Sequence, residues 1–349
     1  MIEHTHTCPI TRRGFVLPPV IIITVLIALL AGAMEFAAWR STRAARLAWN
    51  GERALHATDE VLAATIANWN PITFAQTPIG SRTSLAAHST NGANAIATIV
   101  RTHPLGAFIE ADATSETSGT PRAVHRRVGR ALQLVPPTLP LIATFTALGS
   151  IFAESGTSVS GVDDVTMRDE CGPTRDTASI GGIAARSMRI TSVANVRGAP
   201  VTQSIADTIP RAQFSTAWVT LMQRASVQAW PMAGMGLVTQ PPWNATLINV
   251  PTGGTLGGTS LFEGLLAING NLTVVGTLRV RGLLVVRGAL DARLGQLDVE
   301  GALLVADINN TGSLLGNSVA VRYSQCALRR ALATIAVPTT RPFAVWQER

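Results

Sequence analysis

The most regular pattern in the chain is an alternation of apolar and polar residues between Gly264 and Gly301. Seven glycines punctuate it at steps of six residues, with a single step of seven: Gly264, Gly270, Gly276, Gly282, Gly288, Gly295 and Gly301. Aliphatic residues and glycines occupy the even positions from Leu266 to Leu290, and alternation in a strand places such residues on one face. The pattern predicts short β-strands with hexapeptide-like repeats at 264–301.

The seven-residue step moves the apolar series to odd positions, which Leu297 continues. One extra residue of this kind is what a bulge or a corner supplies. Glycine at every third inward position leaves room for a sharp bend or for the close approach of stacked coils. We therefore expect residues 260–320 to form a β-solenoid or a rolled β-sheet, with an ordinary antiparallel meander as the alternative. Its outer face would display Arg279, Arg281 and Arg287, which are candidate interaction residues.

A second pattern is the run of 21 uncharged residues from Gly14 to Met34. As a helix this run spans about 31 Å, which matches the apolar core of a bilayer. Apolar residues then recur at helical spacing as far as Trp69, and Pro71 ends the pattern. One helix over Phe15–Asn68 is predicted, which crosses a membrane and continues beyond it.

Three arginines follow the uncharged run and form a basic face on this predicted helix. They are Arg40, Arg43 and Arg46. Arginines lie on both sides of the run, so the positive-inside count leaves the orientation ambiguous. A short tail before a large Gly- and Thr-rich region favours a cytoplasmic N-terminus and an exported domain. The basic face would then contact partners just outside the membrane.

Two export signals fit the residues around the start of the helix. Arg12 and Arg13, followed by Gly14-Phe15-Val16-Leu17, resemble a twin-arginine signal. Arg13-Gly14-Phe15 before an apolar helix also resembles the processing site of type IV prepilins, although Pro19 stands where that family has a Glu. Further on, the stretch Arg53–Leu62 (RALHATDEVL) resembles the PilX-type minor pilin family. These resemblances imply a pilin-like or pseudopilin-like N-terminal anchor.

Composition shifts divide the chain into four parts. We expect a cytoplasmic tail at 1–13, a transmembrane and extended helix at 14–70, a mixed helix/strand connecting region at 71–140 and a β-rich extracytoplasmic domain at 141–349. In the third part, basic residues around His125 are interpreted as a solvated helix face: Arg122, Arg126, Arg127 and Arg130. In the fourth part, periodicity predicts helices over Arg211–Ala225 and Tyr323–Leu332.

Composition narrows the chemistry further. The 349 residues include 28 Lys+Arg, all of them Arg, against 21 acids, for a net charge of +7. Without Lys, a Schiff-base lysine and a Gly-Lys-Ser/Thr phosphate loop are excluded. With 47% apolar residues the chain must bury a large core. The arginines are dispersed and Tyr occurs once, so the stacking platforms expected of a nucleic-acid binder are missing.

Catalytic, cofactor-binding and metal residues are not expected. All six His precede residue 126, so the repeats carry no general base for acyl transfer. Cys8, Cys171 and Cys326 form no C-x-x-C pair. The remaining clusters are interpreted as a tail or as surface acids: His4, His6 and Cys8, and Asp163, Asp164, Asp169 and Glu170. Cys171 and Cys326, both on the predicted exported side, are candidates for a disulfide.

These patterns describe a mainly β protein with a long N-terminal transmembrane α-helix, a β-solenoid or rolled β-sheet extracytoplasmic domain and a few packed helices. The expected place is the bacterial inner membrane, single-pass, with the main domain periplasmic. The expected role is a non-catalytic structural subunit that scaffolds a multiprotein membrane complex. Its partners would be other membrane proteins and the lipid bilayer, without nucleic acid, cofactor or small-molecule substrate.

A pilus or a type II secretion pseudopilus is the first candidate assembly. A second is a bioenergetic supercomplex, such as a photosynthetic reaction centre within light-harvesting rings, where the chain would be an accessory subunit. A third hypothesis, from another class, is an exported polymer- or cofactor-binding protein. That hypothesis predicts a groove lined by Trp230, Trp243 or Trp218.

Overall fold

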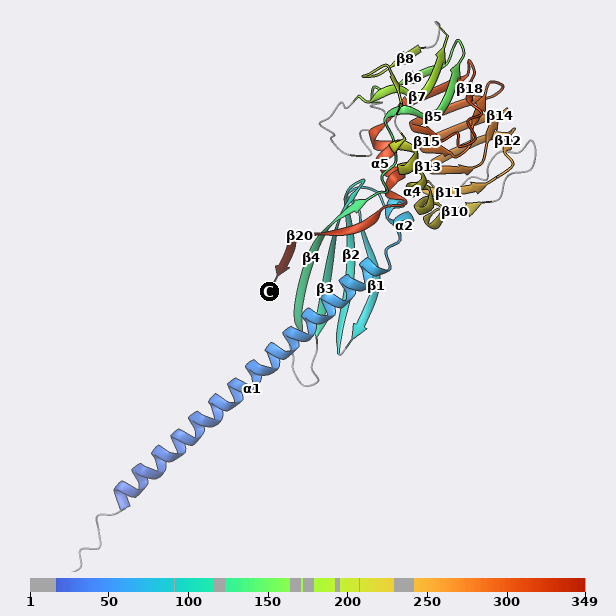
Figure 1. Ribbon diagram of the computed structural model, residues 1–349. Helices are drawn as coiled ribbons and strands as arrows, with labels where there is room; N and C mark the ends of the chain where they lie inside the picture. Colours follow the sequence, from blue (N-terminus) through green and yellow to red (C-terminus); the bar gives the residue numbers. More distant parts are fainter. Residues whose placement is uncertain are drawn as a thin grey trace, which may run out of the picture.

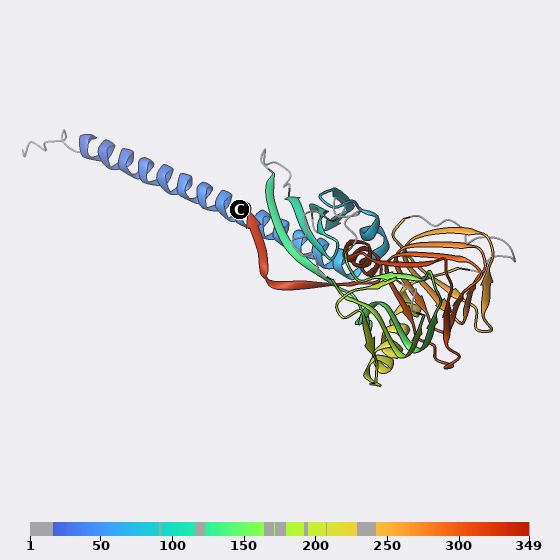
Figure 2. The same ribbon diagram turned by 90° about the horizontal axis from the view of Figure 1, so that it is seen from above.

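The computed structural model describes residues 17–90, 92–115, 123–163, 171, 179–191, 195–206, 208–228 and 242–348. A single long helix, α1 (Leu17–Ala67), runs into a body made of an antiparallel sheet and a curled parallel sheet (Figures 1 and 2). The helix is continuous for 51 residues. The predicted long apolar helix is therefore confirmed over the residues described.

The antiparallel sheet covers the second half of α1. Its strand order is β1 (Arg82–Thr90), β2 (Ala93–His103), β3 (Gly106–Ser115), β4 (Val124–Val135) and β20 (Val337–Glu348). Alternate residues of β2 and β3 are buried in one cluster with Ala54, Ala57 and Leu62 of α1. A short helix, α2 (Pro71–Gln76), follows α1 and starts where the Asn70 side chain caps two backbone N–H groups.

Two features of this sheet differ from the sequence interpretation. The segment around His125 is strand β4, not a helix, and its arginines pair across elements: Arg127 with Asp112 of β3 at 3.1 Å and Arg130 with Asp59 of α1 at 2.9 Å. Arg122 lies outside the described residues. The last strand, β20, returns from the C-terminal end to pair with β4, so the sheet joins the two regions that were divided at residue 140.

In the parallel sheet, the chain winds in coils. The long strands are β11 (Asn244–Asn249), β13 (Thr259–Asn269), β15 (Thr277–Val286), β17 (Gln296–Val305), β5 (Ala143–Ala153) and β7 (Gly181–Ile190). Short strands β12 (Gly254–Leu256), β14 (Leu272–Val274), β16 (Leu290–Ala292) and β18 (Ser313–Leu315) pair with one another, and β18 joins them to β5. Strands β19 (Val319–Tyr323), β6 (Ser158–Ser160) and β8 (Asn195–Arg197) extend the first half of β17. Strands β10 (Ser226–Gln228) and β9 (Thr202–Ser204) pair with β11 and β7.

Glycines mark the bends of this winding. Gly264 pairs with Gly282, and Gly282 pairs with Gly301 on the next strand. These three glycines have φ values of +125°, +136° and +140°, a region that L side chains rarely adopt. A Cβ on Gly282 would overlap the carbonyl oxygen of Gly264. The extra residue of the repeat falls at the turn after β16, where Leu294 is exposed.

The inward positions are those that the alternation predicts. Leu266, Ile268, Leu284, Val286 and the other residues of this series form one buried cluster. The pairing is parallel throughout, so the antiparallel meander is wrong and the rolled sheet is confirmed. Mainly β structure with one long apolar helix is likewise confirmed.

The alternation is incomplete in the second halves of the long strands. There the outward positions are apolar as well, and residues such as Leu265, Leu283 and Leu304 are fully buried. Helices α4 (Ile209–Arg224) and α5 (Gln325–Ala333) contribute Phe214, Trp218 and other residues to the same cluster. Both helices were predicted. They cover part of the outer face of the sheet, which the sequence pattern predicted to be polar and exposed.

Candidate interaction surfaces

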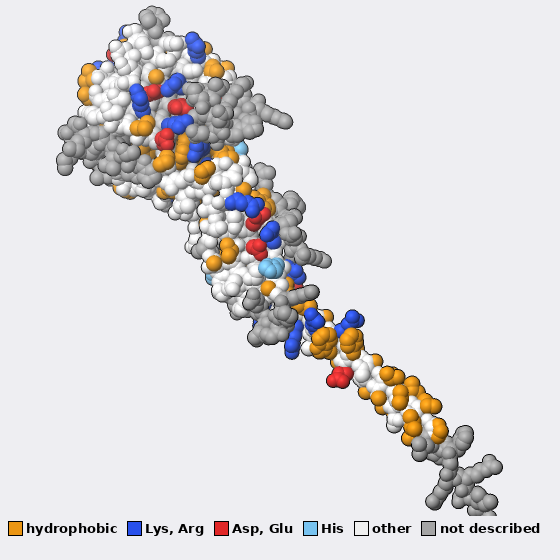
Figure 3. All heavy atoms as spheres, turned by 180° about the vertical axis from the view of Figure 1, so that it is seen from behind, with side chains coloured by type: hydrophobic (Ala, Val, Ile, Leu, Met, Phe, Trp, Pro, Cys, Tyr) orange, Lys and Arg blue, Asp and Glu red, His pale blue; other side chains and the backbone are white. Residues whose placement is uncertain are grey.

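The first half of α1 stands free of the folded body. The side chains described from Pro18 to Trp49 are all exposed, and burial begins at Asn50. Large apolar side chains such as Leu29 and Met34 are 65% and 71% exposed, and Figure 3 shows hydrophobic side chains covering this protruding part. By length and composition α1 qualifies as a single membrane span or a signal sequence. Arg12, Arg13 and the rest of both export signals lie outside the described residues.

The predicted basic face of α1 is present just after the apolar stretch. Arg40 lies over the Phe36 ring at 5.0 Å and Arg43 over the Trp39 ring at 5.3 Å. Arg46 is also exposed. Each of the first two guanidinium groups therefore lies above an aromatic ring one helical turn closer to the N-terminal end of α1.

Of the three predicted arginines of the repeat, Arg279 and Arg281 lie two residues apart on one face of β15, and Arg287 is separate from them. Arg281 lies between two acids of neighbouring strands, Glu263 at 3.3 Å and Glu300 at 3.8 Å. Arg287 lies elsewhere, near α4, where it donates to Asn269 Oδ1 at 2.8 Å and lies 5.8 Å from the Trp218 ring centre. Arg279 is exposed. Arg281 and Arg287 therefore already contact other side chains of the sheet.

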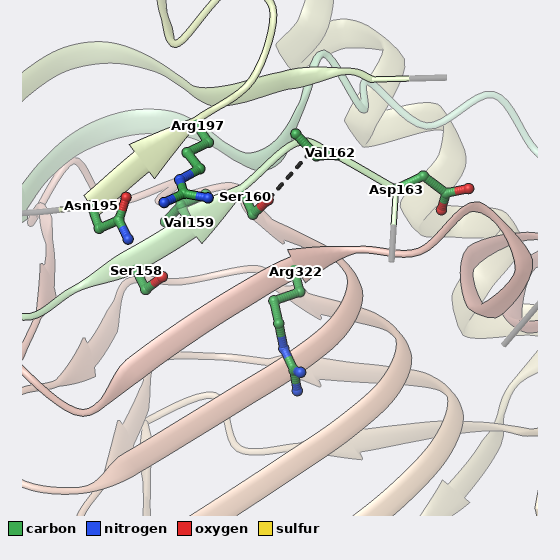
Figure 4. A pocket seen from close by; sticks show the side chains of 8 residues that line it. All are labelled: Ser158, Val159, Ser160, Val162, Asp163, Asn195, Arg197 and Arg322. Atoms are coloured by element: carbon green, nitrogen blue, oxygen red, sulfur yellow. Dashed lines mark hydrogen bonds between the residues drawn. The ribbon is translucent and has the colours of Figure 1, made fainter. Parts of the chain in front are cut away.

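A shallow groove, lined by both polar and apolar groups, lies on strands β19, β6 and β8, with a volume of about 420 Å³. Ser158 and Ser160 form its floor, because the longer side chains of Arg197 and Arg322 stand on the neighbouring strands (Figure 4). Arg322 donates to Asp298 at 3.0 Å. Sequence reasoning missed this groove, because parallel pairing alone brings residues 158, 195 and 322 together.

A second concavity, of about 520 Å³, lies where the antiparallel sheet meets α5. His103 and Arg329 line it, and His103 Nε2 lies 3.5 Å from Arg329 Nη1. Burial, and then the charges of Arg329 and Arg101, lower the pKa of His103. The ring is therefore neutral near pH 7. A third, largely apolar cavity of about 200 Å³ lies beside Trp69 and Phe74.

The junction between the two sheets is built around buried arginines. Arg101 is fully buried and donates to the carbonyl oxygens of Ala75 and Thr77 at 2.7 and 2.6 Å. Burial, reinforced by the charge of Arg330, lowers the pKa of Arg101 to about 10. Arg330 lies 3.8 Å from the ring centre of Trp243. Sequence analysis did not single out Arg101, although this arginine shares the inward parity of Ala97 and Ile99 in β2.

Cys171 and Cys326 are joined by a disulfide at this junction, with their Cα atoms 5.8 Å apart. The bond attaches α5 to the middle of the chain. Asp163, interpreted as a surface acid, accepts a hydrogen bond from the Gln325 backbone N–H at the start of α5. The disulfide and this contact fix the helix that lies between the two sheets.

Replacing both cysteines by serine is expected to lower the free energy of unfolding by about 2–4 kcal/mol, because the bond closes a long loop in the unfolded chain. The loop has a sequence separation of 155 residues. Thermal unfolding with and without reductant measures the effect. The wild-type Tm should fall when reductant is added, whereas the Tm of the double variant should not move. A wild-type Tm that is the same with and without reductant would contradict the prediction.

The tryptophans do not form the groove that the polymer-binding hypothesis requires, as far as the described residues go. Trp218 and Trp243 are each 4% exposed and belong to different buried clusters. Trp230 lies outside the described residues, as do His4, His6, Cys8, Asp164, Asp169 and Glu170. Within the described ranges, no group of three His, Cys, Asp or Glu side chains is placed to hold a metal.

Comparison of the chain with protein-family models, curated proteins and solved structures finds no match. The functional argument therefore depends on the geometry of the chain itself.

Proposed function

We propose that the protein is a membrane-anchored, non-catalytic structural subunit that holds other membrane proteins in an assembly. The observation that carries this proposal is the continuity of α1: one unbroken helix of 51 residues has an exposed apolar first half and a second half packed on a sheet. An anchor continuous with the folded body has no linker to bend. It would therefore fix both the distance and the direction of the body relative to the membrane.

An exported position of the folded body is supported by the disulfide. The arginines after the apolar stretch, taken alone, favour a cytoplasmic body under the positive-inside rule. The Cys171–Cys326 bond favours the opposite side, because disulfides persist in oxidising compartments such as the periplasm. We give the disulfide more weight, since it is a folded-state contact rather than a count of charges. The proposed topology has the N-terminus in the cytoplasm and the body in the periplasm.

A passive role for the curled sheet is supported by how its surface is occupied. Its interior is filled by aliphatic side chains. On its outer face, charges pair across neighbouring strands, as in the set formed by Arg281 with Glu263 and Glu300. Such a body is rigid and presents a fixed polar surface. These are properties of a spacer or a clamp.

Among the candidate assemblies, a pilin-like one is favoured by where the family resemblance falls. The stretch Arg53–Leu62 coincides with the part of α1 that is packed on the antiparallel sheet, where Ala54, Ala57 and Val61 are buried. The residues that carry the resemblance therefore also set how the helix meets the sheet. This leaves the apolar half of the helix free for lipid and for neighbouring subunits.

The test is gentle detergent extraction of the native protein, followed by identification of the proteins that co-migrate with it and sequencing of its N-terminus. Pilus or secretion components, with a chain that begins at Phe15, support the pilin-like assembly. Co-migrating pigment proteins would replace that assembly by a bioenergetic one and keep the scaffold role. An intact chain that is water-soluble and solitary would refute the proposal. A water wash of the same membranes, which releases peripheral proteins, serves as the control.

A further inference from the structure

Helix geometry gives the position, relative to the bilayer, of the residues that follow the apolar stretch. Met34 ends the uncharged run, and Glu35 is the sole acidic residue between Leu17 and Asn50. At 1.5 Å per residue, Phe36 lies about 3 Å beyond Met34, and Trp39 lies about 7.5 Å beyond it. A bilayer's headgroup layer extends about 5–8 Å beyond its apolar core. Both rings would therefore lie in the headgroup layer.

The arginine charges lie deeper than their own Cα atoms. Side chains on a helix lean toward its N-terminus, which here is the membrane end. The positions of the guanidinium groups agree: that of Arg40 lies over Phe36 at 5.0 Å, and that of Arg43 over Trp39 at 5.3 Å. Two positive charges are thereby placed at the level of the two aromatic rings. Arg46 has no such ring contact among the described residues.

These two arginines have no acidic partner within the described part of the chain, and they are exposed. The neighbouring rings of Phe36 and Trp39 are also 55% and 56% exposed. Planar guanidinium groups bind phosphate through paired hydrogen bonds, and Trp is favoured at the boundary of lipid and water. Each feature fits the chemistry of a phospholipid headgroup.

We propose that Arg40 and Arg43 bind the phosphate groups of anionic lipids on the leaflet next to the folded body, and that this contact sets how far α1 protrudes. The inference rests on the proposed membrane anchor and names its lipid partner. It also reconciles the arginines with an exported body, because their charge is neutralised by lipid at the surface. A basic residue near an anionic surface strengthens binding about fivefold.

The test uses the full chain reconstituted in phosphatidylcholine vesicles. Spin-labelled phosphatidylglycerol and phosphatidylcholine report the association constant of each lipid with the protein. The wild type should prefer phosphatidylglycerol by about fivefold or more. In R40Q/R43Q the preference should fall to about one. In R40K/R43K it should be intermediate, because lysine keeps the charge but loses the planar fork.

The matched control is R186Q/R279Q, which removes two exposed arginines of the parallel sheet and should keep the wild-type preference. Equal preference in wild type and R40Q/R43Q would overturn the inference, as would a wild type without preference. The latter is the outcome expected if the arginines serve an acidic protein instead. Alkaline extraction separates the two proposals. A chain retained in the bilayer without lipid preference overturns only this inference, whereas a chain released by alkali overturns the anchor as well.

Discussion

A Gly282→Val variant is expected to lower the free energy of unfolding by about 5 kcal/mol, which combines backbone strain with overpacking. Gly282 has a φ of +136° and is paired with glycines on both neighbouring strands. A Cβ at this position would overlap the Gly264 carbonyl oxygen and would approach the Ala331 Cβ of α5 at 3.0 Å. The neighbouring strand cannot move away without breaking the parallel pairing, and α5 is held in place by the Cys171–Cys326 disulfide. The urea midpoint of the purified chain in detergent measures the loss.

The control for this prediction is Arg279→Val on the same strand. Arg279 is exposed, and a β-branched residue suits a strand, so the free energy of unfolding of this variant should stay within about 0.5 kcal/mol of the wild type. If Gly282→Val unfolds at the wild-type midpoint, the glycine is not a packing requirement of the bend. The reading of the glycine series as the corners of a coil would then fail.

The coils of the parallel sheet could be predicted from the sequence because the features that define them are local. Inward and outward positions alternate with a period of two, and each bend requires a glycine at a fixed distance from the previous one. The alternation alone therefore places Leu266 and Leu284 in the core, where both are found. The same holds for α1, whose uncharged run and lack of proline beyond it determine a helix without reference to the rest of the chain.

The sequence predictions are wrong where a local pattern fits both a helix and a strand, or where the element that packs on a segment is distant in sequence. The arginines of β4 fit a helix face as well as a strand, and the strand is determined by its backbone pairing with β3 and β20. The outward leucines of β13 and β15 are buried under α4 and α5, and the alternation gives no sign of this cover because both helices are distant in sequence.

The candidate surfaces also differ in whether their residues are close together in the sequence. The basic face of α1 was predicted because its residues are neighbours on one helix. The groove of Ser158, Asn195 and Arg322 was not, because its three strands come from separate parts of the chain. Arg101 gave no signal either. Its burial depends on the carbonyl groups of α2 and the loop after it, which no spacing in the sequence reveals.

Replacing Leu26 and Leu29 by arginine is expected to remove the protein from the membrane. Leu26 lies near the middle of the uncharged stretch, and both side chains are exposed, at 53% and 65%. An arginine at the centre of a spanning helix disfavours insertion by about 3 kcal/mol, while the leucine it replaces favours insertion. Two such changes therefore cost about 6–8 kcal/mol, enough to prevent insertion. Alkaline extraction of the membranes should release the variant and leave the wild type in the pellet.

The matched control places the same two charges on the same helix beyond the apolar stretch, as Ser41→Arg and Ala44→Arg. Arginine is a good helix former, and neither pair touches the folded body, because burial along α1 begins at Asn50. Both variants should therefore keep the wild-type circular dichroism, whereas only the control should form the disulfide, because L26R/L29R is not exported to the periplasm. Retention of the control with release of L26R/L29R locates the anchor in the first half of α1. If L26R/L29R stays in the alkali-resistant pellet, α1 is not what holds the protein in the bilayer.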